Sequence, residues 1–336
     1  MARFAVLVVL LLALVGSAPV AAQDASPAAS PVASPAAACV HPELPPGTPT
    51  PMEASPEAGT AGMAGTPEAV AQAEGVAETA EAEAGSPEAA ATPARPEGTP
   101  ADQATIDRLT ALYESAYACL NGGDYLGFAA LYTPEGLLNE FGTANPYDVP
   151  ALIGEFPPPP LVLVSIDAVL ELPDGRLYAE VTYLVGNALA REGAFLVEQD
   201  GELLADAGGG ELPVGVPADA QVADVDLVDY AFVATRTSFA AGTPIAFNVV
   251  NTGQYPHELA VVQLPEGATV EQLLQDPALQ EQVRFVGATF AEPGRAAPPL
   301  VLLDLEPGTY TMVCFVDVPE GVPHVARGMI AQFTVQ

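Results

Sequence analysis

The spacing of apolar and polar positions separates the chain into four stretches, and the first is almost wholly apolar. Arg3 is followed by the run FAVLVVLLLALV and then by the small residues Val20-Ala21-Ala22. A positively charged N-terminus, an apolar run and a small-residue cleavage site are typical of a secretory signal peptide, here residues 1–22. No later apolar run reaches the ~18 residues that a membrane-spanning helix needs. We therefore expect an extracytoplasmic protein, secreted, periplasmic or at the cell surface, with no stable membrane insertion after signal cleavage.

The second stretch, residues 23–100, has no apolar periodicity. It repeats Ala-Ser-Pro and Pro-Glu-Ala units and contains no aromatic residue. Such a segment cannot bury enough apolar area to offset the entropy that its chain would lose on ordering, so we predict that it is disordered. Two roles stay open for it: a spacer that holds the folded part away from the cell surface, or a tail without a role.

The third stretch, residues 101–215, changes from a helical to a strand-like pattern. Apolar residues recur at helical spacing from Ile106 to Leu120, and Gly122-Gly123 ends that helix. Two further short helices are expected in DYLGFAALYTPEGL and VPALIGEF. Strand patterns then flank a Pro-Asp-Gly turn and a Gln-Asp-Gly turn. Helices followed by antiparallel strands predict an α+β domain.

The fourth stretch, residues 223–336, follows a short linker at 216–222 and is nearly all β. The strand candidates, separated by Gly, Pro and Asn turns, are VDLVDYAFVAT, PIAFNVVNT, HELAVVQL, RFVGATFA, LVLLDL, GTYTMVCFV and MIAQFTVQ. One insertion, TVEQLLQDPALQEQV, has helical composition. Short antiparallel strands over this length predict a Greek-key β-sandwich, which makes the whole chain a multidomain protein.

The net charge limits the partners that the protein can bind, and the cysteines indicate the compartment in which it folds. The formal net charge is −34 and the chain has no Lys, which argues against nucleic acid or anionic lipid as a partner. The acidity fits a cationic redox partner, and it fits equally an exported protein that is simply acidic. Of the three Cys, Cys39 and Cys119 are able to pair in an oxidising compartment, or to stay free with Cys119 buried.

The few metal-binding side chains of the chain gather at its C-terminal end. Nine residues separate Cys314 from His324, four separate His324 from Met329, and His257 stands upstream at the end of a β pattern. One thiolate, two imidazoles and a weak axial thioether are the donor set of electron-transfer copper. Each residue alone has an ordinary structural explanation, but all four at strand and loop ends favour a metal site.

This last stretch resembles the cupredoxin family in its plastocyanin- and azurin-like blue-copper branch. The segments PIAFNVVNTGQYPHEL, PGTYTMVCF and PHVARGMIAQFTV carry the resemblance. It implies that His257 and His324 are imidazole ligands, that Cys314 is the thiolate ligand and that Met329 is the axial thioether. The loop from Cys314 to His324 is longer than in small cupredoxins, and loops close to this length occur in copper nitrite reductases.

The resemblance implies a secreted carrier of single electrons with one copper that cycles between Cu(I) and Cu(II). Its redox partner would be a cytochrome or an oxidase. We expect no enzyme activity, because copper enzymes need additional His-rich sites and the chain has three His. A carrier usually presents the edge of its loop His through an apolar patch, here Val322, Pro323 and Val325. The alternative function is copper storage or delivery, or binding of a small ligand without redox chemistry.

In its element order the third stretch resembles the SnoaL-like, or nuclear-transport-factor-like, α+β cone fold. Members of that fold include enzymes, pocket binders and dimerisation modules, so a dimer through this domain is one expectation. The aromatic residues Tyr113, Tyr117, Phe128 and Tyr183 would line a cavity or pack the core. Asp124 and Glu140 are available acids, but no His lies in this region for acid–base chemistry.

Overall fold

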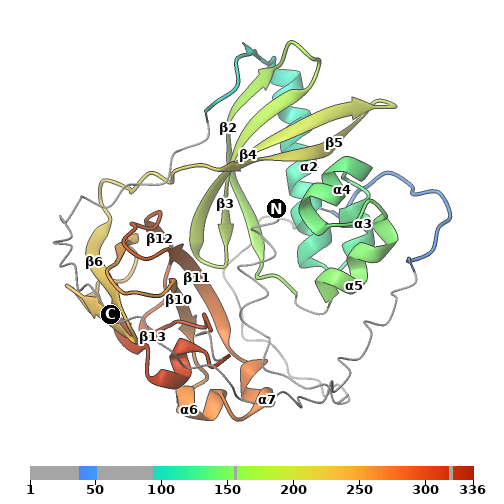
Figure 1. Ribbon diagram of the computed structural model, residues 1–336. Coiled ribbons are helices and arrows are strands. Elements are labelled where there is room, and N and C mark those ends of the chain that lie inside the picture. Colours follow the sequence, from blue (N-terminus) through green and yellow to red (C-terminus); the bar gives the residue numbers. More distant parts are fainter. Residues whose placement is uncertain (1–37, 51–93, 155–156, 318–320) are drawn as a thin grey trace, which may run out of the picture.

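The computed structural model describes residues 38–50, 94–154, 157–317 and 321–336. The predicted signal peptide and most of the segment predicted to be disordered lie outside these residues. Figure 1 shows an α+β part at the N-terminal side and a β-sandwich at the C-terminal side. Among the described residues, no helix has both the length and the apolar character that crossing a membrane requires.

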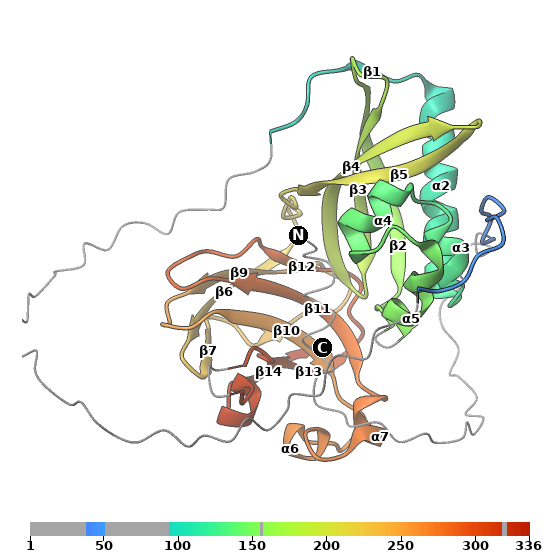
Figure 2. The ribbon, with the colours of Figure 1, turned by 45° about the vertical axis from the view of Figure 1, so that its right-hand side comes forward.

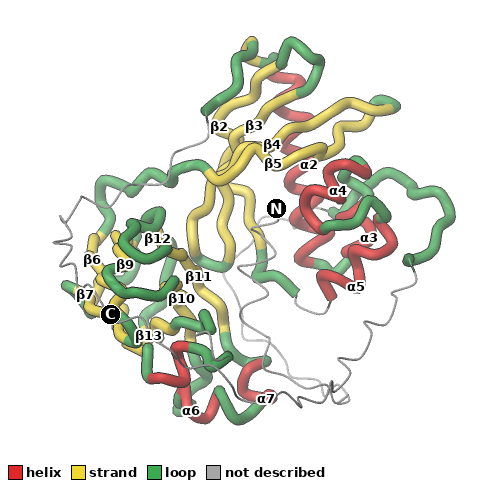
Figure 3. Tube along the Cα trace, viewed as in Figure 1, coloured by secondary structure: helices red, strands yellow, loops and turns green. Residues whose placement is uncertain are grey.

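Apart from one two-residue strand, helices precede strands in the α+β part, as the sequence pattern predicts (Figure 3). The helices are α2 (Gln103–Asn121), α3 (Tyr125–Ala129), α4 (Pro134–Phe141), the 3₁₀ helix η1 (Pro146–Asp148) and α5 (Val149–Gly154). The strands are β1 (Thr99–Pro100), β2 (Leu161–Glu171), β3 (Leu177–Val185), β4 (Ala188–Gln199) and β5 (Glu202–Glu211). Side-chain caps start the helices: Asp102 accepts from the Thr105 N–H and Thr133 from the Gly136 N–H. The helices pack on the sheet through a buried core that includes Leu109, Cys119 and Leu196.

A strap formed by residues 38–50 is fixed to this part (Figure 2, blue). A disulfide joins Cys39 to Cys119, and the Val40 N–H donates to the Ser115 hydroxyl at 2.6 Å. At the other end, the Thr50 N–H donates to Asp148 at 2.6 Å. The prediction that residues 23–100 are disordered throughout is therefore wrong for the strap, because a covalent link and backbone hydrogen bonds replace the apolar burial that its composition lacks.

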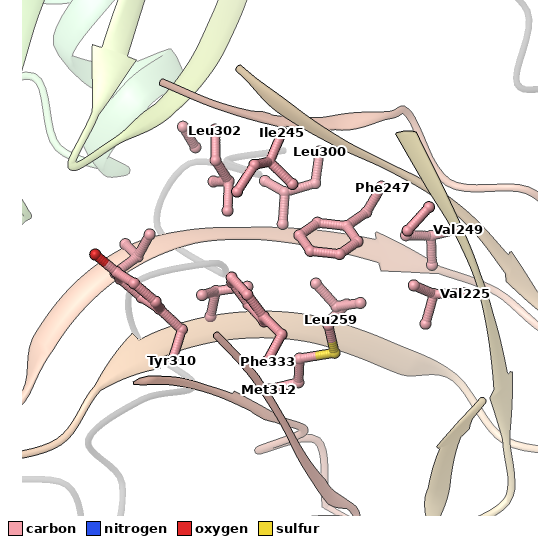
Figure 4. Packing of buried hydrophobic residues seen from close by; sticks show 14 of the residues in the cluster. Val225, Ile245, Phe247, Val249, Leu259, Leu300, Leu302, Tyr310, Met312 and Phe333 are labelled. Carbon is pink, nitrogen blue, oxygen red and sulfur yellow. The ribbon is translucent and has the colours of Figure 1, made fainter. Parts of the chain in front are cut away.

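The C-terminal region is a β-sandwich, as predicted. Its strands are β6 (Gln221–Val228), β7 (Ala231–Ala234), β8 (Ser238–Phe239), β9 (Ile245–Asn251), β10 (His257–Gln263), β11 (Arg284–Ala291), β12 (Leu300–Leu302), β13 (Gly308–Val313) and β14 (Ile330–Val335). The helical insertion forms α6 (Val270–Leu273) and α7 (Pro277–Gln280), and η2 (His324–Arg327) precedes β14. One layer has the order β12-β9-β6-β7 and the other β11-β10-β13-β14-β8. Rings and aliphatic chains such as Phe247, Leu259 and Phe333 fill the space between the layers (Figure 4).

Two boundaries in this region differ from the sequence prediction. The predicted linker 216–222 ends too late, since Gln221 already begins β6 and its N–H donates to the Pro244 carbonyl at 2.8 Å. The predicted continuous strand VDLVDYAFVAT is also wrong, because it turns back at Asp229-Tyr230 and forms two strands, β6 and β7. Tyr230 makes this turn with a φ of 64°, a left-handed conformation that no Gly or Pro signals in the sequence.

The two parts share one sheet. Ala188 at the start of β4 pairs with Leu302 of β12, so the sheet of the α+β part continues into one layer of the sandwich. The neighbouring Asn187 donates its N–H to the Val286 carbonyl at 2.8 Å and accepts from the Leu303 N–H at 2.9 Å. Arg284 adds a hydrogen bond of 2.7 Å to the Asn187 side chain. The β3–β4 turn is therefore docked on the sandwich by backbone bonds.

Candidate metal centre

Strand pairing brings the predicted donors together at one end of the sandwich. His257 is the first residue of β10, and Cys314 follows the last residue of β13, its antiparallel neighbour. His324 opens η2, and Met329 stands just before β14, which pairs with the other side of β13. The ends of three adjacent strands therefore bring all four residues to the same end of one layer.

The long loop between Cys314 and His324 folds back on itself. The His324 N–H donates to the Val316 carbonyl at 2.9 Å, and the Val325 N–H donates to the Cys314 carbonyl at 2.8 Å. Asp317 and Pro323 form a further bridge, and residues 318–320 lie outside the described part. These bonds bring the end of the loop back beside its beginning, so the extra residues do not move His324 away from Cys314.

The three strong donor atoms are close to one another. The Nδ1 atoms of His257 and His324 are 2.9 Å apart. The Cys314 Sγ lies 3.8 Å from the Nδ1 of His257 and 3.4 Å from that of His324. Metal bonds of about 2.0 Å to nitrogen and about 2.3 Å to sulfur place such donors roughly 3 to 4 Å apart. The described residues therefore fit one transition-metal ion among two imidazoles and one thiolate.

Asp229 orients the first imidazole. Its Oδ1 lies 3.1 Å from the Nε2 of His257, and it also accepts from the Gln254 N–H at 2.8 Å. A carboxylate at Nε2 favours the proton on that nitrogen and leaves the Nδ1 lone pair directed at the donor cluster. Asp229 was not among the predicted site residues, since it becomes a neighbour of His257 only through the turn between β6 and β7.

The Cys314 side chain is fully buried and is neutral at physiological pH without a cation. Burial, reinforced by the nearby Glu258 carboxylate, raises the pKa of the thiol to about 12. The Glu258 N–H points at the sulfur at 3.4 Å, and the Glu258 side chain accepts from the Phe315 N–H at 2.7 Å. Burial also raises the pKa of Glu258 to about 7. A thiolate at this position needs a positive ion to replace its proton.

His324 is buried, contrary to the expectation that it presents an edge to solvent. Its exposed fraction is 1%, and the rings of Tyr230 and Tyr255 cover it at centroid distances of 5.2 and 6.2 Å. Arg327 lies over the outer Tyr230 ring at 5.3 Å. Burial, with the neighbouring His257, lowers the pKa of His324 to about 4, so the imidazole is neutral. Its Nε2 atom has no hydrogen-bond partner within the described part of the chain.

Met329 is fully buried in the same core cluster as Cys314. The preceding Gly328 adopts a φ of 93°, which turns the chain from η2 into β14. Val313 and Ile330 are register partners, so Met329 stands next to the end of β13 from which Cys314 projects. This register places the backbone of Met329 next to that of Cys314, which makes Met329 the candidate for the fourth donor.

No protein-family model and no curated protein sequence matches this chain. Solved structures that match it include auracyanin B, with 21% identity over 37% of this chain and 94% of that chain and a TM-score of 0.27. Auracyanin A, a "blue" copper protein from Chloroflexus aurantiacus, matches with 17% identity over 35% and 99% and a TM-score of 0.25. Rusticyanin from Thiobacillus ferrooxidans matches with 18% identity over 36% and 79% and a TM-score of 0.26.

Proposed function

We propose that this chain is an extracytoplasmic blue-copper protein of the cupredoxin type that carries single electrons. One copper would be held by His257, Cys314 and His324, with Met329 as the weak axial donor. The convergence of two Nδ1 atoms and one Sγ within 3.8 Å, all on buried side chains, is the observation that carries the proposal. These are the donor types that suit both oxidation states of copper.

The protein supplies a donor arrangement that is fixed in advance. Asp229 holds the ring of His257, the Glu258 N–H holds the sulfur of Cys314, and two backbone bonds hold the loop before His324. Copper, when bound, supplies the one-electron couple. Donors that are already held in place move little between the two states, and a small reorganisation is what fast electron transfer needs.

Burial of the donors argues against a storage or delivery protein, although it also covers the His324 edge that a carrier usually presents. The side chains of His257 and Cys314 are fully buried, and the loop imidazole lies under two tyrosines. A delivery site exchanges its metal with a partner and therefore needs an open ligand edge. We propose a cytochrome or an oxidase as the redox partner, met through a cationic surface that complements the acidic chain. Catalysis is not part of the proposal.

The test is to load the purified protein with Cu(II) and to record its visible and electron paramagnetic resonance spectra. We expect an intense thiolate-to-copper band and a narrow hyperfine splitting. Cys314→Ser should abolish the band, whereas Met329→Leu should keep the band and shift the reduction potential. A blue band that survives in Cys314→Ser would refute the thiolate assignment. A copper that binds but cannot be reduced and reoxidised reversibly would replace the carrier by the storage function.

A further inference from the structure

The strap of residues 38–50 brings a second group of metal-binding side chains together at the end of α2. Cys39 and His41 stand two positions apart in the strap, Cys119 lies in the last turn of α2, and Asp124 caps α3. One ligand atom from each of Cys39, Cys119 and Asp124 lies within 4.8 Å of the other two. We call Cys39, His41, Cys119 and Asp124 the strap cluster.

The members of the strap cluster approach one another at the distances of metal ligands. The Sγ atom of Cys39 lies 3.2 Å from the Oδ2 atom of Asp124, and the Nε2 atom of His41 lies 3.6 Å from the same oxygen. Zinc bonds of about 2.0 Å to nitrogen or oxygen and about 2.3 Å to sulfur place ligands roughly 3 to 4 Å apart. The two sulfur atoms are closer than that because a disulfide joins Cys39 to Cys119.

The imidazole and the carboxylate are oriented by bonds from their other polar atoms. The Nδ1 atom of His41 lies 3.0 Å from the Pro42 carbonyl oxygen. A carbonyl only accepts, so Nδ1 carries the proton and Nε2 keeps a lone pair directed at the cluster. The Oδ1 atom of Asp124 accepts from the Gly127 N–H at 2.9 Å, which leaves Oδ2 for the cluster. Metal-binding imidazoles and carboxylates are usually held by such outer bonds.

Two neighbouring residues keep the cluster together independently of the disulfide. The hydroxyl of Ser115 accepts from the Val40 N–H at 2.6 Å and donates to the Val40 carbonyl, so the residue between Cys39 and His41 is fixed to α2. Gly127 leaves room for the other two members. A Cβ atom at this position would lie 2.5 Å from the Asp124 Oδ2 and 2.6 Å from the Cδ2 of the His41 ring.

Solvent reaches the strap cluster from one side. Cys119 is fully buried, whereas the side chains of His41 and Asp124 are 34% and 48% exposed, and Cys39 is partly exposed. A thiol reagent can therefore attack the disulfide at Cys39, and an ion can enter beside His41 and Asp124.

We propose that the strap cluster is a zinc site that becomes available when its disulfide is reduced. A dithiol reductant breaks the S–S bond: its two electrons and two protons convert Cys39 and Cys119 to thiols, and the dithiol itself becomes a disulfide. Zn²⁺ then binds both sulfurs as thiolates, together with the Nε2 of His41 and the Oδ2 of Asp124, and the two thiol protons pass to solvent.

The ligand types favour zinc. Two sulfurs, one nitrogen and one oxygen make a four-coordinate set of the kinds that Zn²⁺ binds, whereas Ca²⁺ and Mg²⁺ take oxygen ligands. The redox state of one disulfide thus decides whether a covalent bond or a metal ion fastens the strap to α2. The site is independent of the copper proposal, since it shares no residue with the candidate copper donors.

The test is a zinc titration of the full chain carrying Cys314→Ser, which removes the thiol of the candidate metal centre. One sample is reduced with dithiothreitol and freed of it by gel filtration without oxygen, and the other keeps its disulfide. Competition with a chelator of known affinity should show one more zinc ion per chain in the reduced sample.

Two ligand variants and one control locate the extra zinc. His41→Gln and Asp124→Asn should each weaken its binding by at least about 10-fold, which is what loss of even an outer partner of a metal costs. Asp124→Asn keeps an oxygen that can accept from the Gly127 N–H, so α3 stays capped. The control Glu43→Gln, at an exposed acid of the strap, should bind zinc normally.

Urea unfolding tests whether the folded chain holds the zinc. Zinc should raise the free energy of unfolding of the reduced sample by more than that of the oxidised sample, because a ligand that binds the folded state stabilises it. Co²⁺ in place of zinc should give a thiolate-to-cobalt absorption band in the reduced sample alone. Equal zinc binding by the two samples, unchanged binding in both His41→Gln and Asp124→Asn, or no greater stabilisation of the reduced chain would each overturn the proposal.

Discussion

At the residue scale, the candidate metal centre depends on groups that surround the donors. Asp229 decides which nitrogen of His257 faces the cluster, and the Glu258 N–H directs the Cys314 sulfur. The rings of Tyr230 and Tyr255 pack against the buried side chain of His324. Loss of such outer partners typically lowers metal affinity by about 10- to 100-fold, because they fix ring orientation and raise ligand basicity.

Asp229→Ala should weaken copper binding by about 10- to 100-fold while leaving the visible band in place. The donors stay the same, but the His257 ring loses the carboxylate that sets its tautomer. Competition with a chelator of known affinity measures the change. Asp226→Ala, on the exposed side of β6, is the matched control and should bind copper normally. Unchanged affinity in Asp229→Ala would exclude an orienting role for this carboxylate.

Glu192→Gln should stabilise the protein at pH 8 more than at pH 5. The folded-state pKa of Glu192, about 7, is above its ordinary value of 4.5, so between these values the folded state holds a proton that the unfolded state lacks. Its contribution to stability is present at low pH and is lost as pH rises through 7. Gln cannot ionise, so the gain at pH 8 should be on the order of 1–3 kcal/mol. Urea unfolding at both pH values tests this, and equal shifts at both would contradict it.

At the element scale, two irregular segments are fixed to the rest of the fold by a small number of specific bonds. The strap of residues 38–50 has little to bury, yet the disulfide between Cys39 and Cys119 and hydrogen bonds at Ser115 and Asp148 attach it to α2 and η1. The loop after β13 is held in the same manner, by backbone bonds at its two ends. In the strap these bonds reach residues 75 to 98 positions away, whereas in the loop they join its own two ends.

Cys39→Ala should lower the free energy of unfolding by about 2–4 kcal/mol. The disulfide closes a loop between residues separated by 80 positions, and losing it restores conformational entropy to the unfolded chain. Urea unfolding followed by far-ultraviolet circular dichroism gives the value. The copper spectrum of the variant should be unchanged, because the disulfide and the donor cluster lie in different parts. A variant as stable as the parent chain would show that the strap contributes nothing to folding.

At the scale of the whole molecule, the two parts are joined by a shared sheet and are chemically separate. Ala188 pairs with Leu302. The neighbouring Asn187 forms backbone hydrogen bonds with Val286 and Leu303 of the sandwich. All four candidate copper donors and Asp229 belong to the sandwich, whereas the hydrogen-bonded pair Tyr183 and Glu192 belongs to the α+β part. The SnoaL-like resemblance of that part, and a dimer formed through it, remain predictions.

The sandwich expressed alone as residues 217–336 should bind one copper and give the blue spectrum. A fragment that begins at 223 should be less stable, because it lacks Gln221, whose side chain accepts from the Ala240 N–H and from Arg236. Thermal unfolding and copper titration of the two fragments measure the difference. If neither fragment gives the blue band while the whole protein does, the α+β part is needed for the site.

The sequence by itself determined the order of helices and strands, the β-rich C-terminal region and the candidate donors His257, Cys314, His324 and Met329. These follow from local properties, namely side-chain periodicity, turn residues and the scarcity of His and Cys. Only the tertiary structure decided that Asp229 holds His257 across 28 positions, that Tyr230 covers His324, and that Cys39 pairs with Cys119. The physical reason is that such contacts depend on strand pairing and chain reversal. The left-handed turn at Tyr230 contains no Gly or Pro from which the sequence could predict it.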